Sequence, residues 1–408
     1  MRNRVFVLVA VACAAALAWP VGAASAAAPT AKATGPVVKI GMLMPVQSAQ
    51  VSNPDNVDVF KVTIAAINQR GGVGKNHNRL QGVFCDTRTD PNQEVSCARE
   101  MADQHVVATV YDLVVNNAAA VDGLMEAAKI PRIGLSANST PDFSSSVAFP
   151  LSAGPVAGYV AAGVGFAKEG KKKVFLARTD ASTGGLLKGF IAPPLKQAGV
   201  EVVGEVPLAT GSTDYSPYVT DMQRSGADSV LMAVAEQAGA QFVATMAQLN
   251  NKTRVGVYSP TLSVDTLRKY KSVTKGTLLT NSYPYPSVNN EKRFPALKQY
   301  FAEMKASGKK NLQPNTIKPA GFNTWVALRA FEKVTAGLDT ITNETVLDAL
   351  KTAKDIDMDG LIPPWTPSAP GFSLFKTSSN HTVYVMKFDG KNVVTPKTPV
   401  DITQYFAS

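Results

Sequence analysis

Histidine, cysteine and glycine often form compact catalytic or metal-binding motifs, but their arrangement in this chain matches none of these. The sequence has no GxSxG elbow, no HExxH pair, no phosphate-binding loop and no complete dinucleotide fingerprint. His77, His105 and His381 each lack a second histidine or cysteine at metal-ligand spacing. The sequence therefore predicts no bound metal, no cofactor and no enzymatic activity.

Short polar stretches that follow predicted strands carry the side chains best suited to hold a ligand. In open α/β sheets, ligands bind beyond the carboxyl ends of the strands, where loops from several strands meet. These stretches are rich in hydroxyl and amide groups, which can fix the orientation of a small molecule. The candidate ligand-binding residues are Gln47, Asn116, Asn117, Ser136, Ala137, Asn138, Thr183, Glu236 and Thr261.

Two aromatic residues near the C-terminal third are further candidates. Phe322 and Trp325 lie three residues apart in a predicted helix, so they share one helix face. That face either packs in the core or lines the ligand cleft, and the sequence leaves both interpretations open. We include both residues among the candidate ligand-binding residues.

The elements that must position these side chains follow a regular alternation. Strands are expected at 37–43, 80–84, 106–111 and 132–135, with helical patterns between them. The same rhythm starts again near residue 158, with strands at 173–177, 201–207, 229–234, 255–259 and 278–282. This pattern predicts an α/β protein with two lobes, each built on a doubly wound parallel sheet.

The last third of the chain supplies helices without strands of their own. Because such helices must pack on an existing sheet, we expect the chain to return to the first lobe. Residues 382–395 are then typical of a hairpin around Asp389-Gly390, added to the edge of the second lobe. The predicted lobes are residues 37–154 with 284–362 and residues 155–283 with 363–408, joined by several crossings.

The N-terminal residues 1–26 have the pattern of a signal peptide. Arg2 and Arg4 precede an apolar run at 5–17, and Ala24-Ser25-Ala26 resembles a cleavage site. The alternative is a retained membrane helix, but this needs about 20 apolar residues, and Pro20 and Gly22 interrupt the run. We therefore expect export to the periplasm or to the extracellular, cell-envelope face.

Charge and cysteine content fit an exported protein. The 41 Lys and Arg against 31 Asp and Glu give a net charge of +10, but this excess is dispersed and lacks interleaved aromatic residues. Nucleic-acid binding is therefore not expected. Cys85 ends a predicted strand and Cys97 begins the next helix, so the two can lie within disulfide reach. The alternative is two buried free thiols.

Several segments together resemble a known family. The segments, in chain order, are Val38 to Gly41, Ala65 to Val73, Asp90 to Asn92, Ile130 to Ile133, Thr213 to Tyr215, Gly226 to Asp228 and Tyr384 to Gly390. They are similar to the bacterial type I solute-binding proteins of ABC importers, in particular the leucine/isoleucine/valine-binding group. The resemblance covers nearly all of residues 37–396.

The resemblance implies two lobes with a three-crossing hinge that closes over a small-molecule ligand. The closed protein, which we expect to be a monomer, would deliver that ligand to the permease subunits of an ABC importer. In the family, hydroxyls and helix-start amides of the first lobe hold the ligand's carboxylate. These positions fall on Asn116 or Asn117 and on Ser136 to Asn138 here.

The second lobe departs from the family pattern. In the family, this lobe has a tyrosine in its first loop and an acid in its last loop. In this sequence, those two positions fall approximately on Thr183 and Thr261. Without the acid, a buried ligand ammonium would stay unpaired unless Glu236 or Asp180 substitutes for it. The ligand is therefore an amino acid or, equally, a neutral or carboxylate compound, larger and more apolar given Val114 and Val115.

Two other functions are compatible with the same lobes. A sensor would bind the ligand without delivering it to a permease. An extracellular hydrolase would need a nucleophile with a neighbouring base, and the loops supply hydroxyls with no histidine beside them. A binding protein is the function that the sequence favours.

Overall fold

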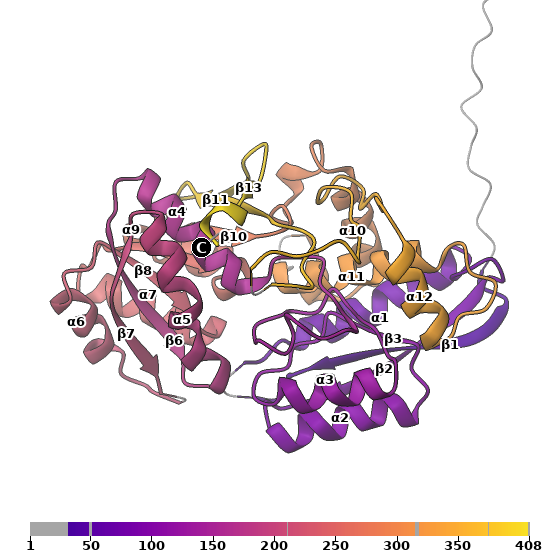
Figure 1. The fold of residues 1–408 in the computed structure, drawn as a ribbon. Helices are drawn as coiled ribbons and strands as arrows, with labels where there is room; N and C mark the ends of the chain where they lie inside the picture. The colour runs from indigo at the N-terminus through magenta and orange to yellow at the C-terminus, as the bar shows by residue number, and fades with distance from the viewer. Residues whose placement is uncertain (1–31, 49–50, 210, 315–317, 374, 407–408) are drawn as a thin grey trace, which may run out of the picture.

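The computed structural model describes residues 32–48, 51–209, 211–314, 318–373 and 375–406. The predicted signal peptide lies outside the described residues. No helix of the described part is both long and apolar enough to cross a membrane. Figure 1 shows the described chain as two sheets side by side, each with its own helices.

The first sheet is parallel throughout, in the order β2-β1-β3-β4-β5. Its strands are β1 (Gly35–Met44), β2 (Asn78–Asp86), β3 (Ala108–Val110), β4 (Arg132–Ile133) and β5 (Ala148–Phe149). Its crossover helices are α1 (Pro54–Gln69), α2 (Pro91–Asp103) and α3 (Ala118–Ala127). Helix α2 shows the local cause of these boundaries, because the Asp90 carboxylate accepts the first free N–H groups, those of Asn92 and Gln93.

The second sheet repeats the parallel pattern and adds antiparallel strands at one edge. Its order is β12-β11-β10-β9-β8-β6-β7. The parallel strands are β6 (Lys173–Thr179), β7 (Glu201–Leu208), β8 (Ser229–Ala233), β9 (Arg254–Tyr258) and β10 (Leu278–Asn281). The helices around it are α4 (Gly154–Lys168), α5 (Ser182–Gln197), α6 (Ser216–Arg224), α7 (Glu236–Gln248), α8 (Val264–Lys269) and α9 (Lys271–Thr274).

The C-terminal helices return to the first sheet. They are α10 (Pro295–Ala306), α11 (Pro319–Thr335) and α12 (Asn343–Thr352). Helix α11 packs along α1, and Gly321 permits the close approach because a Cβ there would lie 2.8 Å from Val59 Cγ2. In the described chain, the connections β5–α4, β10–α10 and α12–β11 therefore cross between the two halves. The exact lobe boundaries drawn from the sequence stay a prediction.

The predicted hairpin is confirmed at the edge of the second sheet. It consists of β11 (Thr382–Phe388) and β12 (Val393–Val394), and β11 pairs antiparallel with both β10 and β12. A short strand, β13 (Val400–Asp401), also pairs with β11. In the turn, the Asp389 carboxylate accepts the N–H groups of Lys391 and Asn392, and Gly390 takes a φ of 104°.

The Cys85–Cys97 disulfide is also confirmed and ties the end of β2 to α2. Replacing both cysteines with serine should lower the free energy of unfolding by about 3 kcal/mol, because the unfolded chain regains the entropy of the closed loop. Urea unfolding of the variant and of the wild type measures the difference. Added reductant should destabilise the wild type alone, and a loss below about 1 kcal/mol would contradict the prediction.

Candidate functional site

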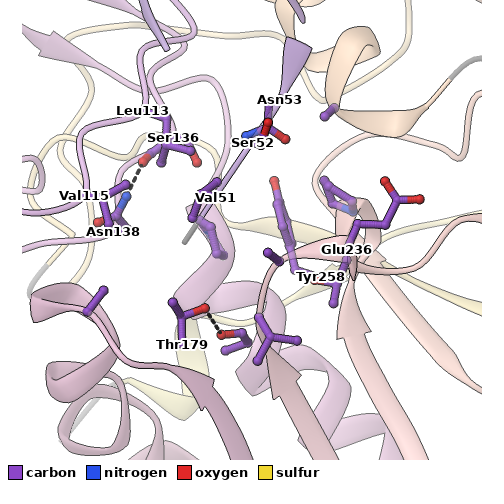
Figure 2. Close-up of a pocket in the computed structure, with 18 of the residues that line it drawn as sticks. Val51, Ser52, Asn53, Leu113, Val115, Ser136, Asn138, Thr179, Glu236 and Tyr258 are labelled. Atoms are coloured by element: carbon purple, nitrogen blue, oxygen red, sulfur yellow. Dashed lines mark hydrogen bonds between the residues drawn. The ribbon is translucent and has the colours of Figure 1, made fainter. Parts of the chain in front are cut away.

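A cavity of about 220 Å³ lies where the carboxyl ends of strands from both sheets face each other. The first sheet contributes the segments that follow β1, β3 and β4, and the second contributes the ends of β6, β8 and β9. Figure 2 shows Ser136 and Asn138 on one side of the cavity and Tyr258 and Glu236 on the other. The polar lining residues are Ser52, Asn53, Asp55, Asn56, Tyr111, Ser136, Asn138, Tyr159, Thr179, Glu236, Tyr258, Thr261 and Lys318.

The first-sheet wall is formed by the loops after β3 and β4. Leu113 and Val115 supply an apolar surface beside Ser136 and Asn138. The Asn138 side chain bridges the two loops, because its Nδ2 donates to the carbonyl oxygen of Ser136 at 3.0 Å and to that of Val114 at 3.3 Å. This bridge holds the two loops in register at the cavity edge.

A buried charge cluster fixes these loops from behind. Arg132, 1% exposed, contacts Asp112 at 3.3 Å, Asp142 at 3.1 Å and also Asp122. Asp142 in turn accepts the N–H of Asn138 at 3.2 Å. Burial raises the pKa of both Asp112 and Asp122, and the attraction of Arg132 only partly opposes it. The cluster therefore links the sheet core directly to the loop that carries Asn138.

A second buried carboxylate occupies the start of α3. Glu94 of α2 is 0% exposed and accepts the N–H groups of Val115 at 2.8 Å, Asn116 at 3.1 Å and Asn117 at 2.7 Å. Burial raises the pKa of Glu94 more than these hydrogen bonds lower it. The helix-start amides that the family resemblance assigns to a ligand carboxylate are thus already satisfied by the protein itself.

The cavity floor couples the two halves through uncharged groups. Asn323 of α11 donates its Nδ2 to Tyr111 Oη at 2.9 Å, and the same atom lies 3.5 Å from Tyr258 Oη. Burial raises the pKa of Tyr111 to about 12 and that of Tyr258 well above its usual value. Both hydroxyls therefore stay neutral and can only donate or accept hydrogen bonds.

An ion pair spans the cavity between the two halves. Lys318, which precedes α11, places its Nζ 2.9 Å from Glu236 Oε2 and 3.6 Å from Asp55 Oδ2. Glu236 is the first residue of α7 on the second-sheet side. Burial lowers the pKa of Lys318, but the hydrogen bonds and charges of Glu236 and Asp55 outweigh it, so the pKa is raised and Lys318 is charged.

Within the described ranges, no group of three or more His, Cys, Asp or Glu side chains could hold a metal ion. The geometry is that of a cavity lined by residues of both halves. A model of the family described as periplasmic binding protein matches residues 37–392. The chain belongs to the periplasmic binding protein family.

Solved structures share the fold of this periplasmic binding protein. A branched-chain amino acid ABC transporter protein from Thermus thermophilus with bound valine has a TM-score of 0.76 at 15% identity, covering 91% of this chain and 98% of that chain. A solute-binding protein from R. palustris in complex with 4-hydroxybenzoate has a TM-score of 0.70 at 21% identity, with coverages of 90% and 98%. A fatty acid transporter substrate-binding protein from Thermomonospora curvata has a TM-score of 0.71 at 16% identity, with coverages of 92% and 96%. No curated protein sequence matches the chain.

The structure of this periplasmic binding protein brings some of the predicted site residues together. Ser136, Asn138, Glu236 and Thr261 line the cavity. Thr183 falls in the first turn of α5 and not in the loop before it, and its side chain is outside the described part of the structure.

Other predicted residues lie elsewhere. Gln47 is exposed outside the cavity lining. The N–H groups of Asn116 and Asn117 bind Glu94, and their side chains donate to the carbonyl oxygens of Thr89 and Pro91. Ala137 is buried behind the lining. These four residues do not line this cavity, and their assignment to ligand binding stays a prediction.

Phe322 and Trp325 also lie outside the cavity lining. Both are 0% exposed and pack against Tyr300 of α10, with ring centroids 4.9 and 5.6 Å from that ring. The Trp325 Nε1 donates to Glu303 at 2.8 Å. Their shared helix face therefore belongs to the core, which was the alternative that the sequence left open.

Sequence reasoning missed nine of the polar lining residues, and four of them show why. Tyr111 and Tyr258 end predicted strands, a signal that could have found them. Asn56 lies in the first turn of α1, and Lys318 comes from a segment far from any predicted strand. Only the packing of α11 on α1 places Lys318 opposite Glu236.

Proposed function

We propose that the protein is an exported solute-binding receptor that captures a small organic ligand and delivers it to the permease subunits of an ABC importer. The observation that carries the proposal is the cavity itself, which is lined by strand ends of both sheets. A ligand there contacts both halves at once, so binding favours the closed arrangement over the open one.

The cross-cleft contacts support a closing mechanism. Three chain crossings lie between the two halves, and the Asn323 amide with Tyr111 and Tyr258 forms a floor that both halves share. The Lys318–Glu236 pair lies on the cavity wall and exists only while the halves are close. Such a partly exposed pair contributes at most about 1 kcal/mol, so the ligand must supply most of the closing energy.

Solved structures with the same fold support the transport setting. They include ABC transporter proteins with bound valine or 4-hydroxybenzoate and a substrate-binding protein of a fatty acid ABC transporter. Membership of the leucine/isoleucine/valine-binding group, first suggested by the sequence, is part of the proposal. So are export to the periplasm and a monomeric state.

A ligand screen with a conformational readout tests the proposed function. Spin labels at Lys351→Cys on α12 and Gln223→Cys on α6 would report the distance between the halves by pulsed electron resonance. We expect at least one compound from a library of amino acids, amides, amines, small carboxylates and sugars to raise the melting temperature by mass action and to narrow the distance distribution. If no compound does both, the receptor function is wrong.

Matched variants locate binding in the cavity. Asn138→Ala should lower the affinity for the bound compound by roughly tenfold, because the substitution removes a polar group from the lining. Asn117→Ala is the control, since its side chain contacts Pro91 outside the cavity, and it should leave affinity unchanged. Equal effects of the two variants would place the ligand elsewhere.

A further inference from the structure

We infer that the cavity selects ligands without a carboxylate: small neutral or cationic molecules that present N–H or O–H donors. This inference rests on the proposed receptor function and names the chemical class of its ligand. It follows from three observations, namely where the first-sheet amides point, which charges line the cavity, and which acceptors are left without a donor.

The amides that could hold a ligand anion are already used by internal anions. Glu94 takes the N–H groups of Val115, Asn116 and Asn117 at the start of α3. Asp142 takes the N–H of Asn138 after β4. An incoming carboxylate would find these four N–H groups already bound and would stand near the internal carboxylates that bind them.

The formal charges of the lining also disfavour an anion. Among the described lining residues, Asp55 and Glu236 carry negative charge and Lys318 alone carries positive charge. Both carboxylates already contact the Lys318 ammonium. A ligand carboxylate that reached Lys318 would have to share its ammonium with Glu236 and Asp55 and would be repelled by both.

The acceptors that remain favour a donor ligand. Asn56 is 1% exposed and lines the cavity, and within the described chain its Oδ1 has no hydrogen-bond donor. Asn138 Oδ1, in the loop after β4, is also buried and has no hydrogen-bond donor within the described residues. A ligand N–H or O–H would satisfy both oxygens, since a buried acceptor without a donor is unfavourable.

The apolar part of the lining suits such a ligand as well. The rings of Tyr111, Tyr159 and Tyr258 line the cavity together with Leu113 and Val115. Aromatic faces attract organic cations and also pack well on neutral hydrocarbon. The cavity thus combines acceptors and carboxylates with an apolar surface.

Matched probe sets test the inference on the intact protein. Each set keeps one carbon skeleton and changes one group: benzoate, benzamide and benzylamine, then isovalerate, isovaleramide and isoamylamine. Titration calorimetry should show the amide or amine of at least one set binding ten or more times more tightly than its carboxylate. Lys318→Met, which frees Glu236 and Asp55, should raise amine affinity, and Glu236→Gln should lower it.

Opposite outcomes overturn the inference. A carboxylate that binds as tightly as its amide and amine, or no binding by any of the six probes, would show the class to be wrong. Closure of the labelled protein by an anionic compound from the wider library would do the same while leaving the receptor function intact. The receptor function itself is wrong only if no library compound both raises the melting temperature and closes the protein.

Discussion

Replacing Arg132 with methionine should lower the free energy of unfolding by about 4 kcal/mol at neutral pH, because three buried carboxylates lose their cation. Arg132, Asp112 and Asp142 are at most 2% exposed in their side chains, and Asp122 is 5% exposed. Water therefore cannot compensate the lost charge. Urea unfolding followed by circular dichroism measures the difference from the wild type.

The difference in free energy of unfolding between the wild type and the Arg132→Met variant should become smaller as the pH falls. Burial raises the pKa of Asp112 and Asp122 above the usual 3.8, and Arg132 opposes that rise. Without Arg132 both pKa values rise further, so the folded variant takes up protons at a higher pH than the unfolded chain. A raised carboxyl pKa gives stability that is complete below the unfolded value and is lost as pH rises through the folded value. Unfolding at about pH 5 and about pH 8 should show the smaller deficit at pH 5.

Arg224→Met is the matched control for this prediction. Arg224 lies on α6 with a side chain 77% exposed, and its contact is a 3.7 Å pair with Asp221. Its loss should change stability by no more than about 0.5 kcal/mol. If Arg132→Met had a similarly small effect, or if its loss of stability grew as the pH fell, Arg132 would not be what stabilises the buried carboxylates.

Glu94→Ala has the second largest expected effect, a loss of about 4 kcal/mol, because the buried N–H groups of Val115, Asn116 and Asn117 lose their acceptor. The loop after β3 should also become less firmly held, since Glu94 binds three of its N–H groups to α2. Chemical unfolding measures the first effect. Faster hydrogen exchange at residues 115–117 measures the second.

Two comparisons make the Glu94 prediction specific. Glu94→Gln keeps one acceptor oxygen and should recover only part of the loss, while Glu100→Ala on the exposed side of the same helix should change little. Sodium formate should stabilise Glu94→Ala more than sodium chloride of equal ionic strength does, because formate can replace the carboxylate. A loss below about 1 kcal/mol, or equal effects of both salts, would mean that Glu94 does not fill an anion position.

The fold could be predicted because its signals are local. The alternation of strands and helices appears as two periodicities along the chain, and Asp389-Gly390 carries the chemistry of a hairpin turn. Cys85 and Cys97 are separated by 12 residues, the distance from a strand end to the following helix. Each of these features depends on residues that are neighbours in sequence.

The candidate site could be predicted only in part. Strand ends indicated Ser136, Asn138, Glu236 and Thr261, which do line the cavity, and their part in ligand binding stays a prediction. They did not reveal that Asn116 and Asn117 donate their N–H groups to Glu94, which lies more than 20 positions earlier. A carboxylate on the buried side of α2 has the same sequence signature as one on its exposed side.

The sequence by itself determined the α/β class, the two sets of parallel strands and the edge hairpin, and it placed Cys85 and Cys97 within reach of each other, because periodicity, turn chemistry and loop length act within a few residues. Only the tertiary structure decided which polar groups face the cavity. Arg132 meets aspartates 10 and 20 positions away, and Lys318 meets Glu236 across the two halves. Charges separated along the chain become partners only when packing brings them together, and in this protein those partners set the polarity of the cavity.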